Sequence, residues 1–345
     1  MINRLKKSLP KISFSVLPFI DKPYIIFFNI IERCNLRCSY CCGKYYSDKE
    51  ELSFSQVKKI LTDFYQLGAR RLGISGGEAL LYKDIDKVIE LAVSLGYDVG
   101  LNSNGILVPL HLKALRLLSN LSISLDGATA KVHDKYRGKG SFEKAIHGLE
   151  AAHKAEIPLH ICCTLTDVNY HEWRDVLKLG EKYNASVLLC PFYPPFDEKN
   201  KFNLPGDYPE KIKQVIKDII KEKKRKGNNI FYSEATYKLM LDWPDYKNDI
   251  SPSKPKGYPI CQFGKKIVII NNKGELFPCL RISRSIPGQG CLKQSVAQAY
   301  RNMTTPPCKA CFWVCTLEYN LLFGLNISAI FNYVNNSLRE KNITK

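Results

Sequence analysis

The chain has 345 residues and a formal net charge of +18 at neutral pH. This length suffices for one large domain or for one domain with an appendage. No apolar run approaches the roughly 20 residues that a membrane helix needs, and prolines and Asp21 interrupt the stretch behind the basic start, so neither an integral membrane segment nor a signal peptide is expected. Residues 1–22 are expected to form a basic N-terminal extension.

The 13 cysteines fall into clusters with metal-like spacing, unlike those of a small disulfide-linked secreted domain. We therefore expect a reducing, cytoplasmic compartment. The positive charge permits an acidic partner or peripheral contact with a membrane, although charge scattered over the surface for solubility is the alternative. The tight basic run at 221–226 ends a helical apolar pattern and is not interleaved with aromatic residues, so nucleic acid is an unlikely partner.

Short apolar runs alternate with helical patterns along the first half of the chain. Strands are predicted at residues 24–31, 71–75, 98–102, 121–125, 159–164 and 187–190, and amphipathic helices among them at 53–67, 84–95 and 141–153. Alternation of this kind indicates a parallel sheet with helices outside it. Six units predict an α/β fold, a partial (β/α)6 TIM-like barrel, over residues 23–199.

The remainder of the chain divides into three further predicted segments. These are a charged helical bridge at 200–257, a small hairpin-containing domain at 258–320, and an apolar helix and tail at 321–345.

The hairpin is predicted from two apolar runs, 265–271 and 275–280, that flank Gly274, because glycine accepts the positive φ of a tight turn. Near the end of the chain, large apolar residues between 318 and 334 predict a helix. This helix is expected to close the open side of the barrel or to pack on the hairpin domain. A membrane contact or a lipid-like substrate is the alternative.

A group of three cysteines directly after the first predicted strand is the most specific motif. Cys34, Cys38 and Cys41 have the spacing C-x3-C-x2-C and offer three thiolates to one metal centre. A 4Fe-4S cluster has four irons and normally takes four protein thiolates, so three ligands leave one iron open for a substrate or cofactor. The alternative is a zinc site completed by the adjacent Cys42 or by a histidine.

This loop, with the aromatic Tyr40 before the last cysteine, resembles the signature of the radical S-adenosylmethionine (SAM) superfamily. The resemblance implies that Cys34, Cys38 and Cys41 ligate a catalytic 4Fe-4S cluster. It also implies that Tyr40 belongs to the cofactor site, and that SAM chelates the open iron through its amino and carboxylate groups.

Further motifs follow the second and third predicted strands, at the edge where barrels carry their chemistry. In the family, the stretch that matches Gly76, Gly77 and Glu78 cradles the amino group of SAM, and paired glycines allow a close backbone approach. Ser103, after the third strand, is either a SAM contact or part of a plain turn.

The fourth strand leads into Ser124-Leu-Asp-Gly, and the run from His133 to Arg137 follows. The resemblance implies that Ser124 and Arg137 contact the ribose and carboxylate of SAM. A guanidinium is well suited to bind a carboxylate through two hydrogen bonds. We expect His133 to pack or to orient this loop.

A second group of cysteines lies in the last third of the chain, at Cys261, Cys279, Cys308, Cys311 and Cys315. Four thiolates can close an iron-sulfur cluster with no iron left open. The arrangement resembles the twitch domain, the single-cluster form of the SPASM domain of radical SAM enzymes. It implies one auxiliary 4Fe-4S cluster on the first four of these cysteines, with Cys315 as the main rival ligand and zinc as the alternative metal.

Two departures from the family pattern concern single positions. Leu280 stands where sulfatase-maturating relatives have an acidic base, which argues against that reaction. Three cysteines of the barrel strands are expected to be buried apolar residues: Cys162, Cys163 and Cys190. The alternative is a functional role, in which one of these thiols donates a hydrogen atom in the radical reaction.

The sequence thus predicts a radical SAM enzyme that splits SAM and abstracts hydrogen from an unidentified substrate, in a net oxidation or bond formation assisted by the auxiliary cluster. Expected partners are a reductase or a flavodoxin- or ferredoxin-type electron donor, and a small-molecule, peptide or lipid-like substrate. Maturation of a ribosomal peptide is the alternative reaction. A non-catalytic iron-sulfur or zinc protein that binds nucleic acid or transfers electrons is the alternative class.

Overall fold

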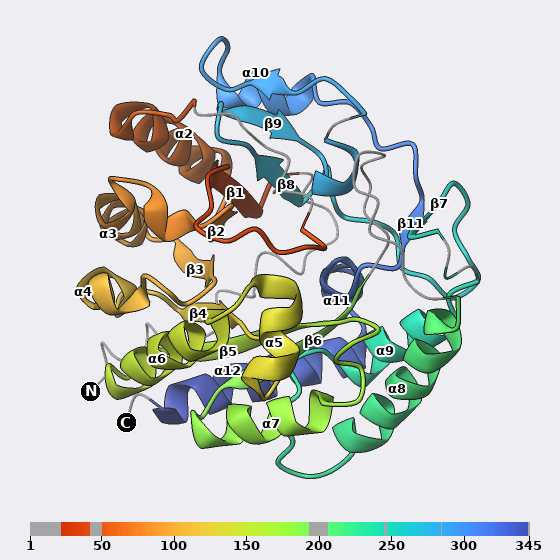
Figure 1. The fold of residues 1–345 in the computed structure, drawn as a ribbon. Helices are drawn as coiled ribbons and strands as arrows, with labels where there is room; N and C mark the ends of the chain where they lie inside the picture. Colours follow the sequence, from red (N-terminus) through yellow and green to blue (C-terminus); the bar gives the residue numbers. More distant parts are fainter. Residues whose placement is uncertain are drawn as a thin grey trace.

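A computed structural model describes residues 22–41, 50–192, 206–244, 246, 248–283 and 285–343. Six strands form the predicted barrel sheet: β1 (Ile25–Ile31), β2 (Arg71–Gly76), β3 (Asp98–Ser103), β4 (Asn120–Ser124), β5 (Leu159–Leu165) and β6 (Ser186–Pro191). Neighbours along the chain pair in parallel throughout. The sheet curves without closing and its helices lie on the outside, so the partial barrel is confirmed (Figure 1).

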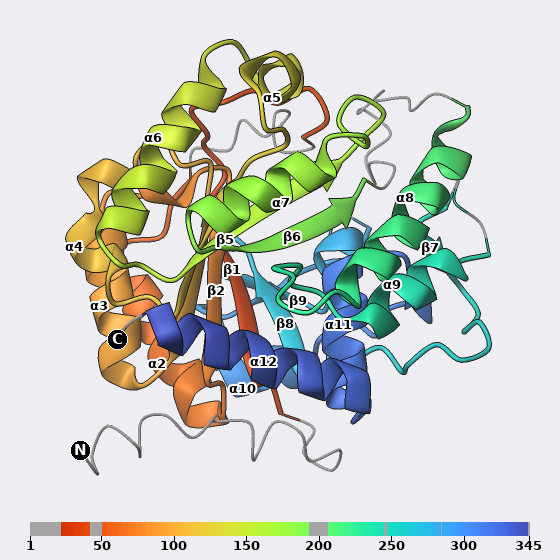
Figure 2. The same ribbon diagram turned by 90° about the horizontal axis from the view of Figure 1, so that it is seen from below.

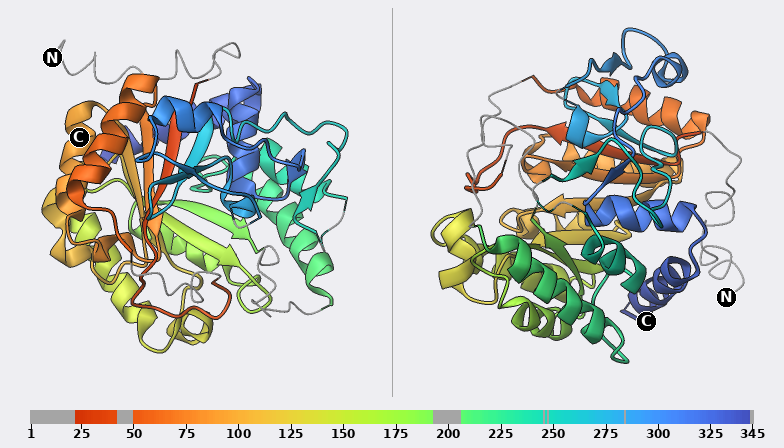
Figure 3. Two further views of the ribbon diagram at one scale, coloured as in Figure 1. Left: turned by 90° about the horizontal axis from the view of Figure 1, so that it is seen from above. Right: turned by 90° about the vertical axis from the view of Figure 1, so that its right-hand side faces the viewer.

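The outer helices are α2 (Phe54–Leu67), α3 (Ile85–Leu95), α4 (Leu112–Leu115), α5 (Ala130–Arg137), α6 (Ser141–Lys154) and α7 (Trp173–Lys182), with short 3-10 turns η3 (Ala79–Leu81) and η4 (Val108–Leu110). Two further views show these helices around the convex face of the sheet (Figure 3). Ser53 caps α2, because its side chain accepts the Gln56 N–H while Gln56 bonds back to the Ser53 N–H. The three predicted helices are confirmed.

The strands bury their outward side chains under these helices. In β5, Ile161, Cys163 and Leu165 are fully buried, whereas Cys162 and Thr164 between them stay partly exposed. Successive side chains of a strand point to opposite faces, so Cys162 and Thr164 face the concave side. The prediction of buried packing is therefore right for Cys163 and wrong for Cys162.

The predicted hairpin is confirmed as β8 (Ile267–Ile270) and β9 (Glu275–Phe277), but it does not stand apart from the barrel. Strand β8 pairs in parallel with β1, and β10 (Gln289–Gly290) pairs with β9, so one sheet has the order β10-β9-β8-β1-β2-β3-β4-β5-β6. A separate two-stranded ribbon joins β7 (Ile250–Ser251) to β11 (Ala310–Cys311). The remaining short elements here are η5 (Leu280–Ile282) and α10 (Val296–Arg301).

The bridge contains α8 (Tyr208–Lys223) and α9 (Glu234–Leu241). The predicted apolar stripe of α8 is buried, at Ile212, Val215, Ile216, Ile219 and Ile220.

The end of the chain forms two helices and not the single one predicted, α11 (Val314–Phe323) and α12 (Ile327–Ile343). They part at Gly324 and Leu325, and Leu325 has a φ of 61° that no helix continues through. Helix α11 lies inside the curve of the sheet, where Tyr319 meets Phe27 of β1 edge to face at 5.9 Å (Figure 1). It thus begins within the segment assigned to the hairpin domain and covers the open side of the barrel.

Helix α12 packs beside α9 and α11 (Figure 2). A buried carboxylate holds the three together. Glu318 of α11 accepts hydrogen bonds from Ser233 Oγ at 2.7 Å, from Thr236 Oγ1 at 2.6 Å and from Asn332 Nδ2 at 3.0 Å. Charge-assisted bonds of this kind are the strong ones, so the carboxylate fixes α11 against the barrel.

Candidate active site

The loop that follows β1 carries the three cysteines of the C-x3-C-x2-C motif. Cys38 is buried, Cys34 is half-buried and Cys41 is exposed, while Cys42 lies outside the described residues. The Leu36 N–H lies 3.4 Å from Cys34 Sγ. Burial raises the pKa of Cys34 and raises that of Cys38 to about 11. Both thiols are therefore protonated at neutral pH and must release their protons when a metal binds.

The paired glycines serve the backbone of this loop. Gly77 N–H donates to Ile31 O at 2.8 Å and Glu78 N–H donates to Arg33 O at 2.9 Å. A Cβ atom on Gly77 would stand 2.3 Å from Arg33 O, and one on Gly76 would stand 2.2 Å from Ile31 O. The close approach expected of these glycines is thus an approach of the cysteine loop itself.

The Glu78 carboxylate is buried among groups of its own chain. It accepts hydrogen bonds from Ser103 Oγ at 2.9 Å, from the Asn104 N–H at 2.7 Å and from the Leu80 N–H at 3.2 Å. Burial raises the pKa of Glu78. Ser103 and Glu78 therefore contact each other and connect the loops after β2 and β3, while their predicted contacts with SAM remain predictions.

Asn104 connects these loops to the cysteines. Its Nδ2 donates to Asn35 Oδ1 at 2.6 Å and lies 4.0 Å from Cys34 Sγ. Asn104 follows Ser103 directly in the sequence, but no local pattern indicates its contact with the cysteine loop. The loops after β1, β2 and β3 therefore form one hydrogen-bonded unit.

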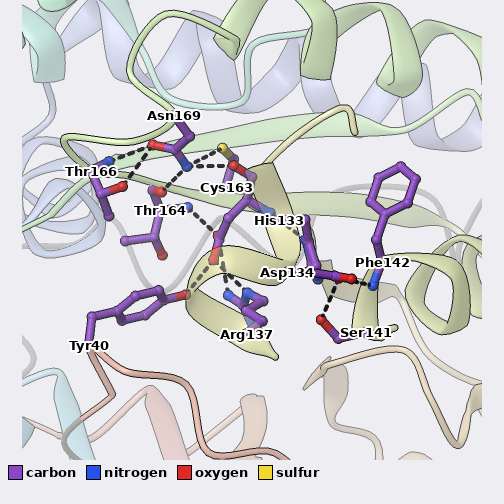
Figure 4. Close-up of polar contacts among 11 residues, drawn as sticks. Tyr40, His133, Asp134, Arg137, Ser141, Phe142, Cys163, Thr164, Thr166 and Asn169 are labelled. Carbon is purple, nitrogen blue, oxygen red and sulfur yellow. Dashed lines mark hydrogen bonds and ion pairs between the residues drawn. The ribbon is translucent and has the colours of Figure 1, made fainter. Parts of the chain in front are cut away.

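A second network joins the cysteine loop to the end of β4 (Figure 4). Asp126, fully buried, accepts hydrogen bonds from Arg137 Nε at 2.5 Å, from Arg137 Nη2 at 3.2 Å, from Tyr40 Oη at 2.6 Å and from the Thr164 N–H at 3.0 Å. Burial alone would raise the pKa of Asp126, but the Arg137 charge and these bonds outweigh it and lower the pKa. Asp126 is thus an ionised anchor for Tyr40 and Arg137.

Sequence reasoning missed Asp126. It lies in the quoted Ser-Leu-Asp-Gly motif, but nothing in that motif shows which donors will surround it. Arg137 was expected to bind the SAM carboxylate, but its Nε and Nη2 groups donate hydrogen bonds to Asp126. Ser124 is partly exposed at the end of β4 on the concave face. Direct contacts of Ser124 and Arg137 with SAM remain predictions.

His133 has the expected structural position. Its Nδ1 accepts the Asp126 N–H at 3.1 Å, and the ring lies edge to face with Phe142 at 5.8 Å. Burial first, and then the charge of Arg137, lowers the pKa of His133 to about 4. The ring is therefore neutral at physiological pH.

The second group of cysteines lines a narrow cavity beside the hairpin. Its thiols come from four positions, and apolar side chains such as Phe263 and Trp313 complete the walls. The cavity-lining cysteines are Cys261, Cys279, Cys308 and Cys311. These are the four predicted ligands. Burial raises the pKa of Cys279 to about 12, so proton release again accompanies metal binding.

Cys315, the predicted rival, does not line this cavity among the described residues. It belongs to the first turn of α11 and lies within electrostatic range of Cys162 and Cys190 on the concave face, and also of Cys279 and Cys311 of the second group. The Cys190 sulfur is 3.6 Å from Leu188 O and 3.9 Å from Tyr232 Oη. Cys190 is partly buried and packs against the apolar core, so the predicted apolar packing holds for it in part.

One backbone feature recurs at both groups. The Leu36 N–H donates to Cys34 Sγ, and the backbone N–H groups at the same spacing after Cys261, Cys279 and Cys311 oppose the rise in pKa that burial causes in those thiols. Hydrogen bonds to sulfur stabilise thiolates and tune iron-sulfur clusters. Both donor sets therefore fit iron-sulfur clusters.

No three His, Cys, Asp or Glu side chains in the described ranges are already grouped around one possible metal ion. The thiolates that hold a 4Fe-4S cluster lie farther apart than the ligands of a single metal ion, because each thiolate binds a different iron. Cys34, Cys38 and Cys41 lie within electrostatic range of one another on one loop, as such a cluster requires.

The fold and the two thiol groups define an iron-sulfur enzyme built on a partial barrel. Residues 28–180 match the family described as the radical SAM superfamily. The match covers the barrel from β1 into α7 and agrees with the predicted radical SAM domain, whose family uses a 4Fe-4S cluster and SAM.

Two relatives and one solved structure show the extent of the likeness. The AdoMet-dependent heme synthase of Methanosarcina barkeri is 29% identical over 282 residues, covering 76% of this chain and 78% of that one. Mycofactocin maturase MftC of Mycolicibacterium smegmatis is 24% identical over 267 residues, covering 75% and 65%. Streptococcus suis SuiB bound to S-adenosylmethionine superposes with a TM-score of 0.65 at 15% identity, covering 87% and 68%, which shows a shared fold.

Among the described residues, no single helix is long and apolar enough to cross a membrane. Helices α11 and α12 reach that apolar content only when they are counted together, across a bend of 104°.

Proposed function

We propose that this enzyme cleaves SAM reductively at the Cys34, Cys38 and Cys41 loop and modifies a peptide in a net oxidation or bond formation. The observation that carries the proposal is the joining of this three-thiol loop to the turns after β2, β3 and β4, with a closed four-thiol cavity beside the same sheet. An open iron site and a closed one thus flank one concave face.

When bound, a reduced 4Fe-4S cluster supplies an electron that splits SAM into methionine and a 5'-deoxyadenosyl radical, which removes a hydrogen atom from carbon. Cys34, Cys38 and Cys41 would hold that cluster, and Cys261, Cys279, Cys308 and Cys311 the auxiliary one.

The other residues of the site hold and orient. The glycine pair keeps the cysteine loop against β2, and Glu78 with Ser103 fixes the turn after β3. Asp126 holds Tyr40 and Arg137 at the opposite edge. Helix α11 covers the open side of the barrel and limits the access of water, which protects a reactive intermediate from side reactions.

The peptide assignment is supported by the printed names of similar proteins. One relative is named a mycofactocin maturase, and the SuiB fold has also been solved bound to its precursor peptide SuiA. The net charge of +18 favours association with an acidic flavodoxin- or ferredoxin-type electron donor. Free thiols and reduced clusters require a reducing compartment, which we take to be the cytoplasm.

The test is anaerobic reconstitution of the full chain and of the triple variant C34A/C38A/C41A. The wild type should carry about eight irons and form 5'-deoxyadenosine when dithionite is added, whereas the triple variant should keep about four irons and form none. Cys291, a buried cysteine outside both groups, supplies the matched control C291A, which should behave as the wild type. Zinc without SAM cleavage in the wild type, or cleavage in the triple variant, contradicts the proposal.

A further inference from the structure

The concave face of the sheet carries polar side chains that the chain itself does not use. Asn29 of β1, Ser75 of β2 and Asn102 of β3 face it, and none of the three side chains has a hydrogen-bond partner among the described residues. Asn102 is exposed although both of its neighbours, Leu101 and Ser103, are buried. An exposed amide near the carboxyl end of a central strand means that this end of the concave face is open.

The three side chains form a row. Asn29 and Ser75 are direct partners in the register of β1 and β2. Asn102 stands one residue beyond the registered pair Ile74 and Leu101, so it lies next to Ser75 on the neighbouring strand. The row lies near the carboxyl ends of the strands, and the cysteine loop begins where β1 ends, two residues after Asn29.

Opposite this row, β5 and β6 present thiols. Cys162 and Cys190 are partly exposed on the same concave face. Only β4 separates β3 from β5, so a peptide that is bound on the row and extends across β4 would reach these two thiols.

Toward the carboxyl ends of β1 to β6, the inward-facing strand positions also carry no charge. The inward positions from the middle of each strand onward are Phe27, Asn29, Gly73, Ser75, Gly100, Asn102, Ser122, Ser124, Cys162, Thr164, Leu188 and Cys190, and none is acidic, basic or histidine. Nearer the amino ends, Arg71 and Asp98 neutralise each other at 3.0 Å, and His160 is buried against Phe231. Arg137, after β4, is paired with Asp126, so an anionic group held on these described strand positions would lose water without gaining a cation from them, which is costly.

We infer that Asn29, Ser75 and Asn102 form the subsite for the reacting part of the substrate, and that this part is an uncharged segment of a peptide bearing amide or hydroxyl groups. The inference rests on the proposed function and narrows the range of substrates. A phosphorylated or nucleotide substrate would bring negative charge to strand positions that carry no positive side chain. Carboxamide side chains both donate and accept, so they suit peptide amides.

The thiols serve as reporters in the test. Reconstituted protein without SAM is labelled with N-ethylmaleimide under anaerobic conditions, and the labelling rates of Cys162 and Cys190 are measured by peptide mass spectrometry. Three probes are compared: a capped neutral hexapeptide of Gly, Ser, Asn and Gln, the same peptide carrying phosphoserine, and inorganic phosphate. The variants are N29A/N102A and the matched control N335A, an exposed asparagine on α12.

The neutral peptide should slow labelling saturably in the wild type and in N335A. The half-protecting concentration should rise about tenfold in N29A/N102A, as expected for the loss of two neutral hydrogen bonds. Protection by phosphopeptide or phosphate at lower concentration overturns the inference. So does protection that is equal in N29A/N102A and N335A, or no protection by any peptide.

Failure of this inference can be told from failure of the proposed function, because SAM cleavage is measured on the same preparation. Cleavage without protection by the neutral peptide rejects the subsite and leaves the enzyme assignment standing. Protection without cleavage in protein that holds both clusters supports the subsite and rejects the chemistry.

Discussion

The buried Asp126 anchor provides a sharp test of how the cysteine loop is held. Asp126→Asn keeps the size of the side chain and removes its charge. Arg137 is then left buried without a counter-ion, and the new amide group points N–H donors at the N–H donors of Arg137. The Tyr40 hydroxyl, 2.6 Å from Oδ2, also loses its anionic acceptor.

The expected loss is large. Breaking a buried ion pair by removing one partner costs about 3–5 kcal/mol, because the remaining charge stays buried. Tyr40→Phe removes only one hydrogen bond to a charged group and should cost about 1.5–3 kcal/mol. The two variants therefore separate loss of the ion pair from loss of the link to the cysteine loop.

Urea unfolding of the purified chain measures both losses. A double-mutant cycle with Asp126→Asn and Arg137→Gln should give a coupling free energy of at least about 1.5 kcal/mol. Hydrogen exchange over the cysteine loop should quicken in both single variants, since each releases Tyr40. A loss below about 1 kcal/mol for Asp126→Asn, or a coupling near zero, would refute an anchoring role.

Three further outcomes are expected. Gly77→Ala should lower the rate of SAM cleavage at least about tenfold, because the new Cβ would stand 2.3 Å from Arg33 O and push the cysteine loop away. Gly206→Ala is the control and should have no effect in the same assay, because a Cβ there meets no atom within 4 Å. Cys315→Ser should retain the auxiliary iron and Cys308→Ser should lose it, as iron analysis of reconstituted protein will show; equal loss would place Cys315 among the ligands. The folded pKa of His133, about 4, lies below its ordinary 6.5, so the unfolded chain binds more protons between these values and stability should fall by about 3 kcal/mol as pH drops through that window. Chemical unfolding at several pH values checks this, and a slope that persists in His133→Asn would assign it to another group.

The sequence predicted the barrel well because each strand carries its own signal. Apolar runs located β1 to β6, and an apolar stripe located α2. The parallel pairing of β8 with β1 was not predicted. It joins segments more than 200 residues apart, and register between distant strands depends on tertiary packing that no local pattern encodes.

In the candidate site, too, the residues with a local sequence signal were predictable and their tertiary contacts were not. Spacing and the family resemblance pointed to both groups of cysteines, and folding brings four of the second group around one cavity. The partners of Glu78 and Arg137 were not predictable, because both side chains turned toward groups of their own chain brought together by folding. Gly77 was recognised for the right property, close approach, but the approaching group is the Arg33 backbone.

The pairing of β8 with β1 has a consequence for dissecting the enzyme. The strand that launches the first thiol loop shares a hydrogen-bonded ladder with the strand that leads to the second. Removal of the chain beyond residue 257 would strip the outer neighbour from β1 and leave its N–H and C=O groups open to other molecules, the condition that drives intermolecular strand addition. The two thiol groups consequently rest on one continuous sheet, whose strand pairing would set the separation of the clusters that they would hold.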